Sequence, residues 1–207
     1  MDQKIAAVLA EYDSRAAAER QEMMSLTREQ MGARRDDFLI SVGPETGSFM
    51  NMLARDAKAK TLIELGTSYG YSTIWLAEAA RANGGKLISL DVHAGKQDYA
   101  GKALERAGLR EFVDFKLGDA LQILLNLDLR YDFVLIDLWK DLYVPCLDLL
   151  YPRLNRDAFI VADNMIQPVY SQKDAAIYRR HVRGKANIES ILLPLGAGIE
   201  LSKYTGG

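Results

Sequence analysis

Short apolar segments alternate with amphipathic ones through the middle of this chain, and this alternation constrains its fold more than any other feature. Strands are predicted at 61–65, 86–91, 112–118, 131–137 and 158–164. The stretches between and after them predict helices at 71–82, 96–108, 119–127 and 171–183, with most of 142–154 also helical. Strands that are apolar nearly throughout are typical of a parallel sheet buried on both faces. Strand–helix–strand units then give an α/β three-layer sandwich.

Two further strands are expected near the end of the chain, at 188–194 and 198–204. They lie too close together for a helical crossover, and Gly196 and Gly198 stand between them. This spacing predicts an antiparallel hairpin. The hairpin would complete a seven-stranded, mostly parallel, Rossmann-like sheet.

Residues 1–40 lack the alternation of strands and helices and are predicted to be helical. Helices are predicted over 2–21 and 26–37, where Thr27 is expected to cap the second, and a third begins at Pro44 or Glu45. We therefore divide the chain into an N-terminal helical arm, residues 1–40, and a catalytic or binding domain, residues 41–207. The arm is expected to be either a lid over a binding site or a homodimer contact.

Composition excludes several classes of protein. The chain has 207 residues, 49% apolar and 26% charged, which is typical of a globular protein with a core. Its net charge of −2 provides no field to attract nucleic acid, and its single cysteine, Cys146, cannot form an internal disulfide. Neither a membrane-spanning run nor a signal-peptide pattern is present, so we expect a cytoplasmic protein without membrane contact.

The loop after the first strand, Glu64 to Ser72, carries glycines at 66 and 70. Glycine lets a backbone turn sharply and approach a ligand, although a plain strand-to-helix turn also uses glycine. Ser68 stands where a dinucleotide-binding fingerprint has its second glycine, which counts against NAD. Glu64 is a charge within an apolar run, so it needs partners, which are either a ligand or, as a structural alternative, the amides of the loop.

Acidic residues also follow the second and third strands. Asp91 is placed to accept hydrogen bonds from ribose hydroxyls, which together with the glycine loop indicates a nucleoside-containing ligand. Asp119 either caps its helix or contacts an adenine amino group, and both roles are compatible. Trp139 packs either on a flat ligand or on the core.

The fourth and fifth strands end in Asp137, Asp163 and Asn164. If these strands are neighbours, the three side chains form an oxygen-only site suited to Mg²⁺, Mn²⁺ or Ca²⁺; otherwise they are turn-forming residues. Neither His93 nor His181 falls among them, so a catalytic zinc site is not expected. Lys140 is either a general base beside such a cation or an exposed lysine that opens a helix.

Together these strand-end residues resemble the class I S-adenosylmethionine-dependent methyltransferases, and more closely the small metal-dependent O-methyltransferases of the catechol and caffeoyl-CoA type. The resemblance runs from about Val42 to the end of the chain. It rests on GPETGSFMNMLA, IELGTSYGYSTIWLA, LDVH, GDA, IDLWKDLY and VADN. GPETG and the closing GAGIELS look like the bacterial branch.

The resemblance implies S-adenosylmethionine and a divalent metal, with Mg²⁺ expected first, as cofactors. Residues implied to bind S-adenosylmethionine are Val42, Glu64, Gly66, Tyr71, Ser72, Asp91, Asp119, Ala120, Asp137 and Trp139. Asp137, Asp163 and Asn164 would bind the metal, and Lys140 would take a proton from the acceptor hydroxyl. Leu138 stands where the catechol enzyme has histidine, and no acidic residue near 194–198 matches the one that binds the second catechol hydroxyl.

The expected function is therefore transfer of a methyl group from S-adenosylmethionine to a hydroxyl of a small molecule, with a vicinal-diol aromatic as the expected class. Two alternatives stay open. One is a metal-independent methyltransferase acting on another small or macromolecular acceptor. The other is a nucleotide-binding domain without catalysis, because this type of sheet hosts many functions.

Overall fold

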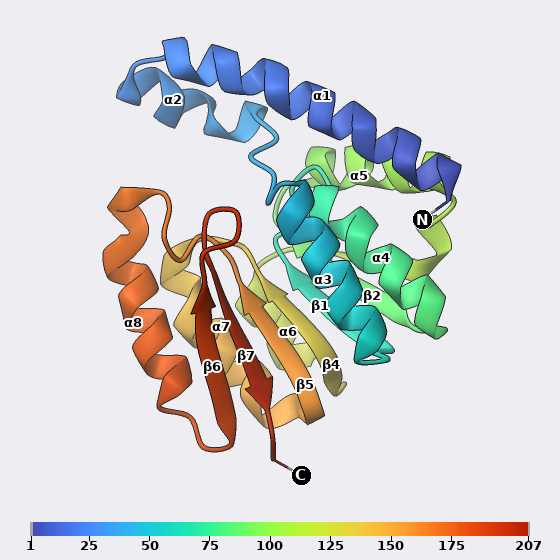
Figure 1. The fold of residues 1–207 in the computed structure, drawn as a ribbon, viewed down its shortest axis with the longest axis vertical. Helices are drawn as coiled ribbons and strands as arrows, with labels where there is room; N and C mark the ends of the chain where they lie inside the picture. Colours follow the sequence, from blue (N-terminus) through green and yellow to red (C-terminus); the bar gives the residue numbers. More distant parts are fainter. Residues whose placement is uncertain (1, 207) are drawn as a thin grey trace.

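The computed structural model describes residues 2–206, and its centre is one sheet of seven strands with helices on both faces (Figure 1). The strands are β1 Thr61–Leu65, β2 Lys86–Asp91, β3 Val113–Leu117, β4 Tyr131–Ile136, β5 Leu154–Ala162, β6 Ile188–Leu193 and β7 Ile199–Tyr204. Their order is β3-β2-β1-β4-β5-β7-β6. The first five pair in parallel, whereas β7 pairs antiparallel with both β5 and β6. The predicted α/β sandwich with a C-terminal hairpin is confirmed.

Eight α-helices are described: α1 Gln3–Ser25, α2 Arg28–Arg34, α3 Pro44–Asp56, α4 Tyr71–Asn83, α5 Ala94–Ala107, α6 Ala120–Asn126, α7 Tyr143–Leu150 and α8 Gln172–Arg183. Short 3₁₀ turns span Arg35–Asp37, Arg110–Phe112, Lys140–Leu142, Tyr151–Arg153 and Val169–Ser171. The predicted cap at Thr27 is confirmed, because its hydroxyl accepts from the Gln30 amide while the Gln30 side chain accepts from the Thr27 amide. Two predicted boundaries were wrong: α1 continues to Ser25, and β5 begins at Leu154.

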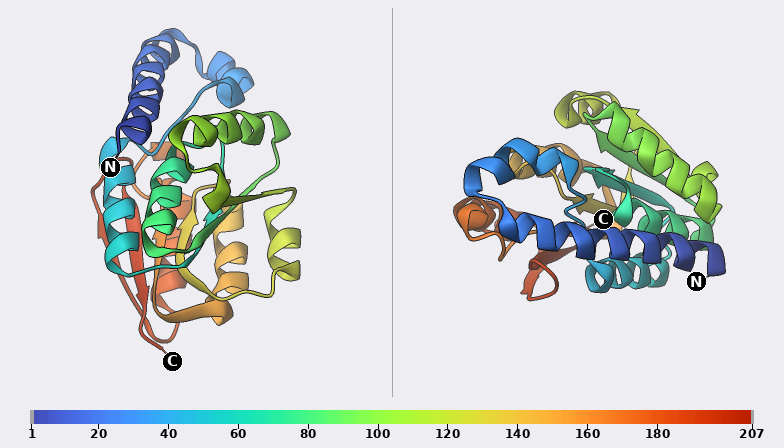
Figure 2. Two further views of the ribbon diagram at one scale, coloured as in Figure 1. Left: turned by 90° about the vertical axis from the view of Figure 1, so that its right-hand side faces the viewer. Right: turned by 90° about the horizontal axis from the view of Figure 1, so that it is seen from above.

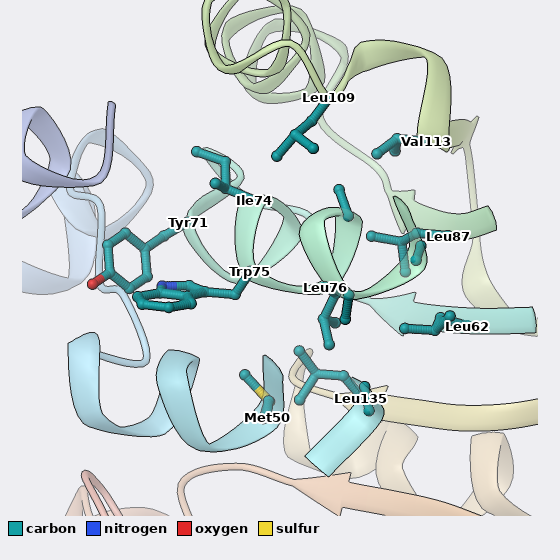
Figure 3. Close-up of a cluster of buried hydrophobic side chains, with 14 of the residues drawn as sticks. Met50, Leu62, Tyr71, Ile74, Trp75, Leu76, Leu87, Leu109, Val113 and Leu135 are labelled. Carbon is teal, nitrogen blue, oxygen red and sulfur yellow. The ribbon is translucent and has the colours of Figure 1, made fainter. Parts of the chain in front are cut away.

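Two hydrophobic cores lie on opposite faces of the sheet, because successive strand side chains point to opposite sides. On one face Leu62 and Leu87 pack beneath α3 and α4, with Met50, Ile74 and Leu76 around them (Figure 3). On the other face residues of β1, β2, β4 and β5 pack against α6, α7 and α8. Cys146 is buried in this second core.

The N-terminal arm packs onto the domain. Ile5, Val8, Leu9 and Tyr12 of α1 are buried in the first core, and the Tyr12 hydroxyl donates to the Tyr69 carbonyl at 2.5 Å. In Figure 1, α1 lies across one end of the sheet and α2 lies above α8, and the view from above in Figure 2 agrees. No helix among residues 2–206 is both long and apolar enough to cross a membrane.

The carboxyl ends of β1 and β4 meet where the strand order reverses, which is where ligands bind in open parallel sheets. Gly66 follows β1 with a φ of 105°, and a Cβ atom there would lie 2.0 Å from the Asp137 carbonyl oxygen after β4. Only glycine lets the two loops approach this closely.

Candidate active site

A pocket opens at the carboxyl ends of β1, β2, β3 and β4, and it contains about 990 Å³ of space, part of it open to solvent. We call it the main pocket. Seven of the predicted site residues line it: Gly66, Asp91, Asp119, Ala120, Asp137, Trp139 and Asn164. A second, side pocket of about 600 Å³ adjoins it and is lined by Lys140, Asn164, Trp139 and residues around Tyr170. Trp139 and Asn164 line both pockets.

Loop amides hold the carboxylate of Asp91 at the floor of the main pocket. One carboxylate oxygen accepts from the Ser68 amide at 2.7 Å, and the other accepts from the His93 amide at 2.8 Å. The carboxylate therefore fixes the loop after β1 against the end of β2. Each carboxylate oxygen keeps a further lone pair for a ligand hydroxyl.

Asp119 caps α6, since its carboxylate accepts from the Gln122 amide at 2.9 Å. The helix-capping interpretation is thus confirmed, and the adenine contact stays a prediction. Ala120 begins α6 beside it. Trp139 also lines the pocket and is 53% exposed, so the part of its indole ring that Arg35 does not cover is accessible to a flat ligand.

Glu64 lies outside the pocket lining and is completely buried. Its carboxyl oxygens accept from the hydroxyls of Ser72 and Thr73 at 2.6 Å and from that of Ser89 at 2.5 Å. Burial raises the pKa of Glu64 to about 7, although the three hydroxyls oppose this. The partners of the Glu64 carboxyl are thus hydroxyl groups of the protein and not the loop amides that the structural alternative expected, and its role in cofactor binding stays a prediction.

Three other predicted cofactor residues, Val42, Tyr71 and Ser72, are not part of the lining of the main pocket. Val42 is buried in the first core, and the Ser72 hydroxyl is engaged by Glu64. Tyr71 is also buried, and its hydroxyl donates to Asp13 of the arm at 2.8 Å. Their roles in cofactor binding stay predictions.

Asp137, Asp163 and Asn164 come together at the ends of β4 and β5, which are neighbours as predicted. Asp163 is 2% exposed, and its Oδ1 has no hydrogen-bond partner. Burial raises the pKa of Asp163, and the nearby Asp137 raises it further. Burial likewise raises the pKa of Asp137, whereas Lys140 and Arg35 lower it.

The ammonium of Lys140 lies against this cluster. It donates to Asn164 Oδ1 at 3.1 Å, to the Asp163 carbonyl at 3.2 Å and to the Tyr143 hydroxyl. Burial lowers the pKa of Lys140, while Asp137 and Asp163 oppose the shift. The sequence did not point to Tyr143, although its position three residues after Lys140 across a helical turn was a usable signal.

The donor set fits a hard divalent cation. Across residues 2–206, no three histidine, cysteine, aspartate or glutamate side chains are arranged to hold a metal, so the site depends on two carboxylates and one amide. A buried carboxylate oxygen without a partner is costly, and a cation would satisfy it. Oxygen-only donors of this kind suit Mg²⁺ and similar ions.

The arm supplies a wall of the main pocket, in line with the expected lid, although the sequence pointed to none of the arm residues that form it. Arg35, Asp36, Phe38 and Ile40 line it together with Lys96 of α5. Asp36 accepts from Lys96 at 2.6 Å, which ties the arm to the domain. No local spacing could have revealed contacts between residues so far apart in the chain.

Comparisons with known proteins identify the family. The sequence profile described as "O-methyltransferase" matches residues 13–204. The chain is 38% identical to a catechol O-methyltransferase of Niastella koreensis over 132 residues. This alignment covers 62% of the chain and 59% of that relative. The chain is also 30% identical to caffeoyl-CoA O-methyltransferase 2 of Eucalyptus globulus over 187 residues, 80% of this chain and 75% of the relative.

A solved structure supports the same assignment. Cofactor-bound Rv0187 from MTB is 27% identical, with a TM-score of 0.76 over 100% of this chain and 92% of the other. The alignment with the bacterial catechol enzyme spans less than two thirds of that enzyme's length. The profile match nevertheless covers nearly the whole of this chain, and the sheet order and glycine loop agree with it. The chain belongs to the O-methyltransferase family.

Proposed function

We propose that this protein transfers the methyl group of S-adenosylmethionine to a hydroxyl of a small vicinal-diol aromatic molecule, with a divalent metal ion and Lys140 as a base. One observation carries the proposal. The main pocket, with its glycine loop and Asp91, adjoins a buried cluster of Asp137, Asp163 and Asn164 that Lys140 contacts. A methyl donor and a hydroxyl acceptor would thus meet at one place.

Binding of the donor follows from the walls of the main pocket. The Asp91 carboxylate is suited to ribose hydroxyls, and Gly66 lets the loop after β1 lie directly against the Asp137 backbone in the pocket wall. Trp139 offers an aromatic face for an adenine ring. The cofactor-bound relative, which shares this fold, supports a cofactor in the same pocket.

Asp137, Asp163 and Asn164 would hold the metal ion. Bound there, it would lower the pKa of an acceptor hydroxyl and fix its position. Lys140 would take the proton from that hydroxyl, because burial already favours its neutral form. The acceptor oxygen would then bond to the methyl carbon as the bond from that carbon to the sulfonium sulfur breaks, and S-adenosylhomocysteine, a thioether, would leave. Much of the rate gain comes from holding the two reactants in line.

The arm acts in this proposal as a lid. Phe38 and Ile40 close one side of the main pocket, and the Asp36–Lys96 ion pair fastens them. The Tyr69 hydroxyl also donates to the Asp36 carbonyl at 2.9 Å. Excluding water from the pocket would strengthen the electrostatic interactions within it. A homodimer contact through the arm stays a prediction.

The test is methyl transfer from labelled S-adenosylmethionine to a panel of vicinal-diol aromatics, with Mg²⁺ or with excess EDTA. We expect product with Mg²⁺, none with EDTA, and none from the Lys140→Met variant. Activity that persists in EDTA would indicate a metal-independent methyltransferase. Cofactor binding without transfer to any acceptor would indicate a nucleotide-binding domain instead.

A further inference from the structure

The side pocket contains a cation that the proposed chemistry does not use. Arg35, in the turn after α2, lines both pockets and is half-buried. Its guanidinium carbon lies 4.6 Å from the centre of the Trp139 ring, and one of its nitrogens lies 3.5 Å from the Tyr170 hydroxyl. Arg35 therefore connects the arm, the wall of the main pocket and the rim of the side pocket.

The neighbouring arginine shows how different this setting is. Arg34 forms ion pairs with Glu22 at 2.7 Å and with Asp37 at 3.3 Å. Among the ion pairs of the described residues, none involves Arg35. A guanidinium has five N–H donors in a planar fork, and here only one long hydrogen bond, to the Tyr170 hydroxyl, engages them, although its charge also acts on Asp137. A half-buried guanidinium in this state is suited to an anionic ligand.

A carboxylate is the anion that this position fits best. The fork of a guanidinium matches the two oxygens of a carboxylate, and the Trp139 ring that it covers would restrict its orientation. Lys140, which also lines the side pocket, would face the acceptor hydroxyl under the proposed function. An aromatic acceptor lying between them would have its diol and its carboxylate at opposite ends.

Two acidic residues of the side pocket compete with this interpretation. Asp141 and Asp174 also line it and would favour an amine on the acceptor. Both are exposed, so water screens them. Arg35 is more buried, and charges removed from water interact more strongly with a ligand. Arg35 should therefore determine that the preferred substituent on the acceptor is negatively charged.

We propose that Arg35 is a specificity-determining residue that selects vicinal-diol acceptors carrying a carboxylate. The inference rests on the proposed function, because it assumes that the side pocket holds the acceptor. It predicts that the protein prefers a carboxylate-bearing catechol to its neutral amide, and both to a catecholamine.

The experiment compares kcat/KM for protocatechuate and for its primary amide, using the full chain with S-adenosylmethionine and Mg²⁺. For each protein we take the ratio of kcat/KM for the acid to kcat/KM for the amide. This ratio is then compared between the natural protein and its variants, so that the different intrinsic reactivity of the two acceptors cancels. Arg35→Gln should lower the acid-to-amide ratio roughly 10- to 100-fold, as expected for a charge-assisted hydrogen-bonded pair. Arg34→Gln is the matched control and should leave the ratio unchanged, because Arg34 lines neither pocket.

Two results would overturn the inference. One is an acid-to-amide ratio that Arg35→Gln does not change. The other is a preference for dopamine over protocatechuate that Asp174→Asn removes, which would assign selection to the acidic rim.

A binding measurement separates this inference from the proposed function. If no diol is methylated, protocatechuate is titrated into the protein with Mg²⁺ and S-adenosylhomocysteine, and the quenching of tryptophan fluorescence, to which Trp75 and Trp139 both contribute, is followed. Binding that weakens at least tenfold in Arg35→Gln, but not in Arg34→Gln, supports anion selection even when the activity fails. Equal or undetectable binding in all three proteins refutes it.

Discussion

The variant Glu64→Gln should be clearly more stable than the natural protein near pH 8 and only slightly more stable near pH 5. The Glu64 carboxyl is fully buried within β1, and burial raises its pKa from 4.5 to about 7. Three hydroxyl donors, from Ser72, Thr73 and Ser89, favour the ionised form but do not outweigh burial. Glutamine has the size and shape of the protonated carboxyl and never ionises.

The sign of the effect follows from proton binding. Between pH 4.5 and about 7 the folded protein binds more protons at this position than the unfolded chain does. The free energy of unfolding therefore falls as the pH rises through this window. The difference between the two pKa values corresponds to a stabilisation of the folded state by about 3 kcal/mol. This stabilisation is fully present below the lower pKa and is lost above the upper one. Glutamine avoids this loss.

The assay is urea unfolding followed by far-UV circular dichroism at about pH 5 and about pH 8. Because Asp137 and Asp163 also titrate, the informative quantity is the difference between the two proteins at each pH. Glu189→Gln, on the exposed side of β6, is the matched control and should give the same difference at both pH values. If Glu64→Gln is less stable than the natural protein near pH 8, the hydroxyls hold an ionised carboxylate and the reasoning is wrong.

Three further predictions concern the site. In differential scanning fluorimetry, Mg²⁺ should raise the Tm of the natural protein. Asp163→Asn should raise the Tm in the absence of metal, because it removes a buried carboxylate. The Tm of this variant should no longer respond to Mg²⁺. Gly66→Ala should weaken S-adenosylmethionine binding at least tenfold in calorimetry, because the new Cβ would meet the Asp137 carbonyl. Gly32→Ala is the control and should leave this binding unchanged, because its Cβ would meet nothing within 4 Å. Lys140→Met should lower kcat by about 10²-fold or more in the Mg²⁺ assay, as expected for loss of a general base, while a loss below tenfold would exclude that role.

The sheet could be predicted from the sequence because its strands are continuous apolar runs separated by helical stretches. Each strand end then located a polar residue, and the parallel pairing of β4 with β5 brought Asp137 and Asp163 to one edge. The hairpin was also readable from glycine spacing, although the insertion of β7 between β5 and β6 was not. Insertion of that kind depends on pairing between whole strands, which short-range patterns do not encode.

The partners of individual side chains could not be predicted, because they come from distant parts of the chain. Glu64 is satisfied by hydroxyls 8, 9 and 25 residues away, and no spacing rule connects these positions. The Tyr71 hydroxyl, expected near the cofactor, reaches Asp13 of the arm instead. A family motif identifies which residues lie near a site, but burial and competing donors decide which of them face the ligand.

The division of the pocket between sheet and arm explains which residues the motifs could not reveal. Residues suited to the chemistry, such as Asp137 and Lys140, follow strand ends, where the backbone of the sheet fixes their positions. Arg35 and Phe38 come from an irregular segment between α2 and α3, held to the domain by a few side-chain contacts. A change in the arm can therefore alter the charge and shape facing the acceptor without disturbing the strand ends. Under the proposed function, this separation would let one catalytic sheet serve different hydroxylated molecules, with Arg35 setting the preference in this chain.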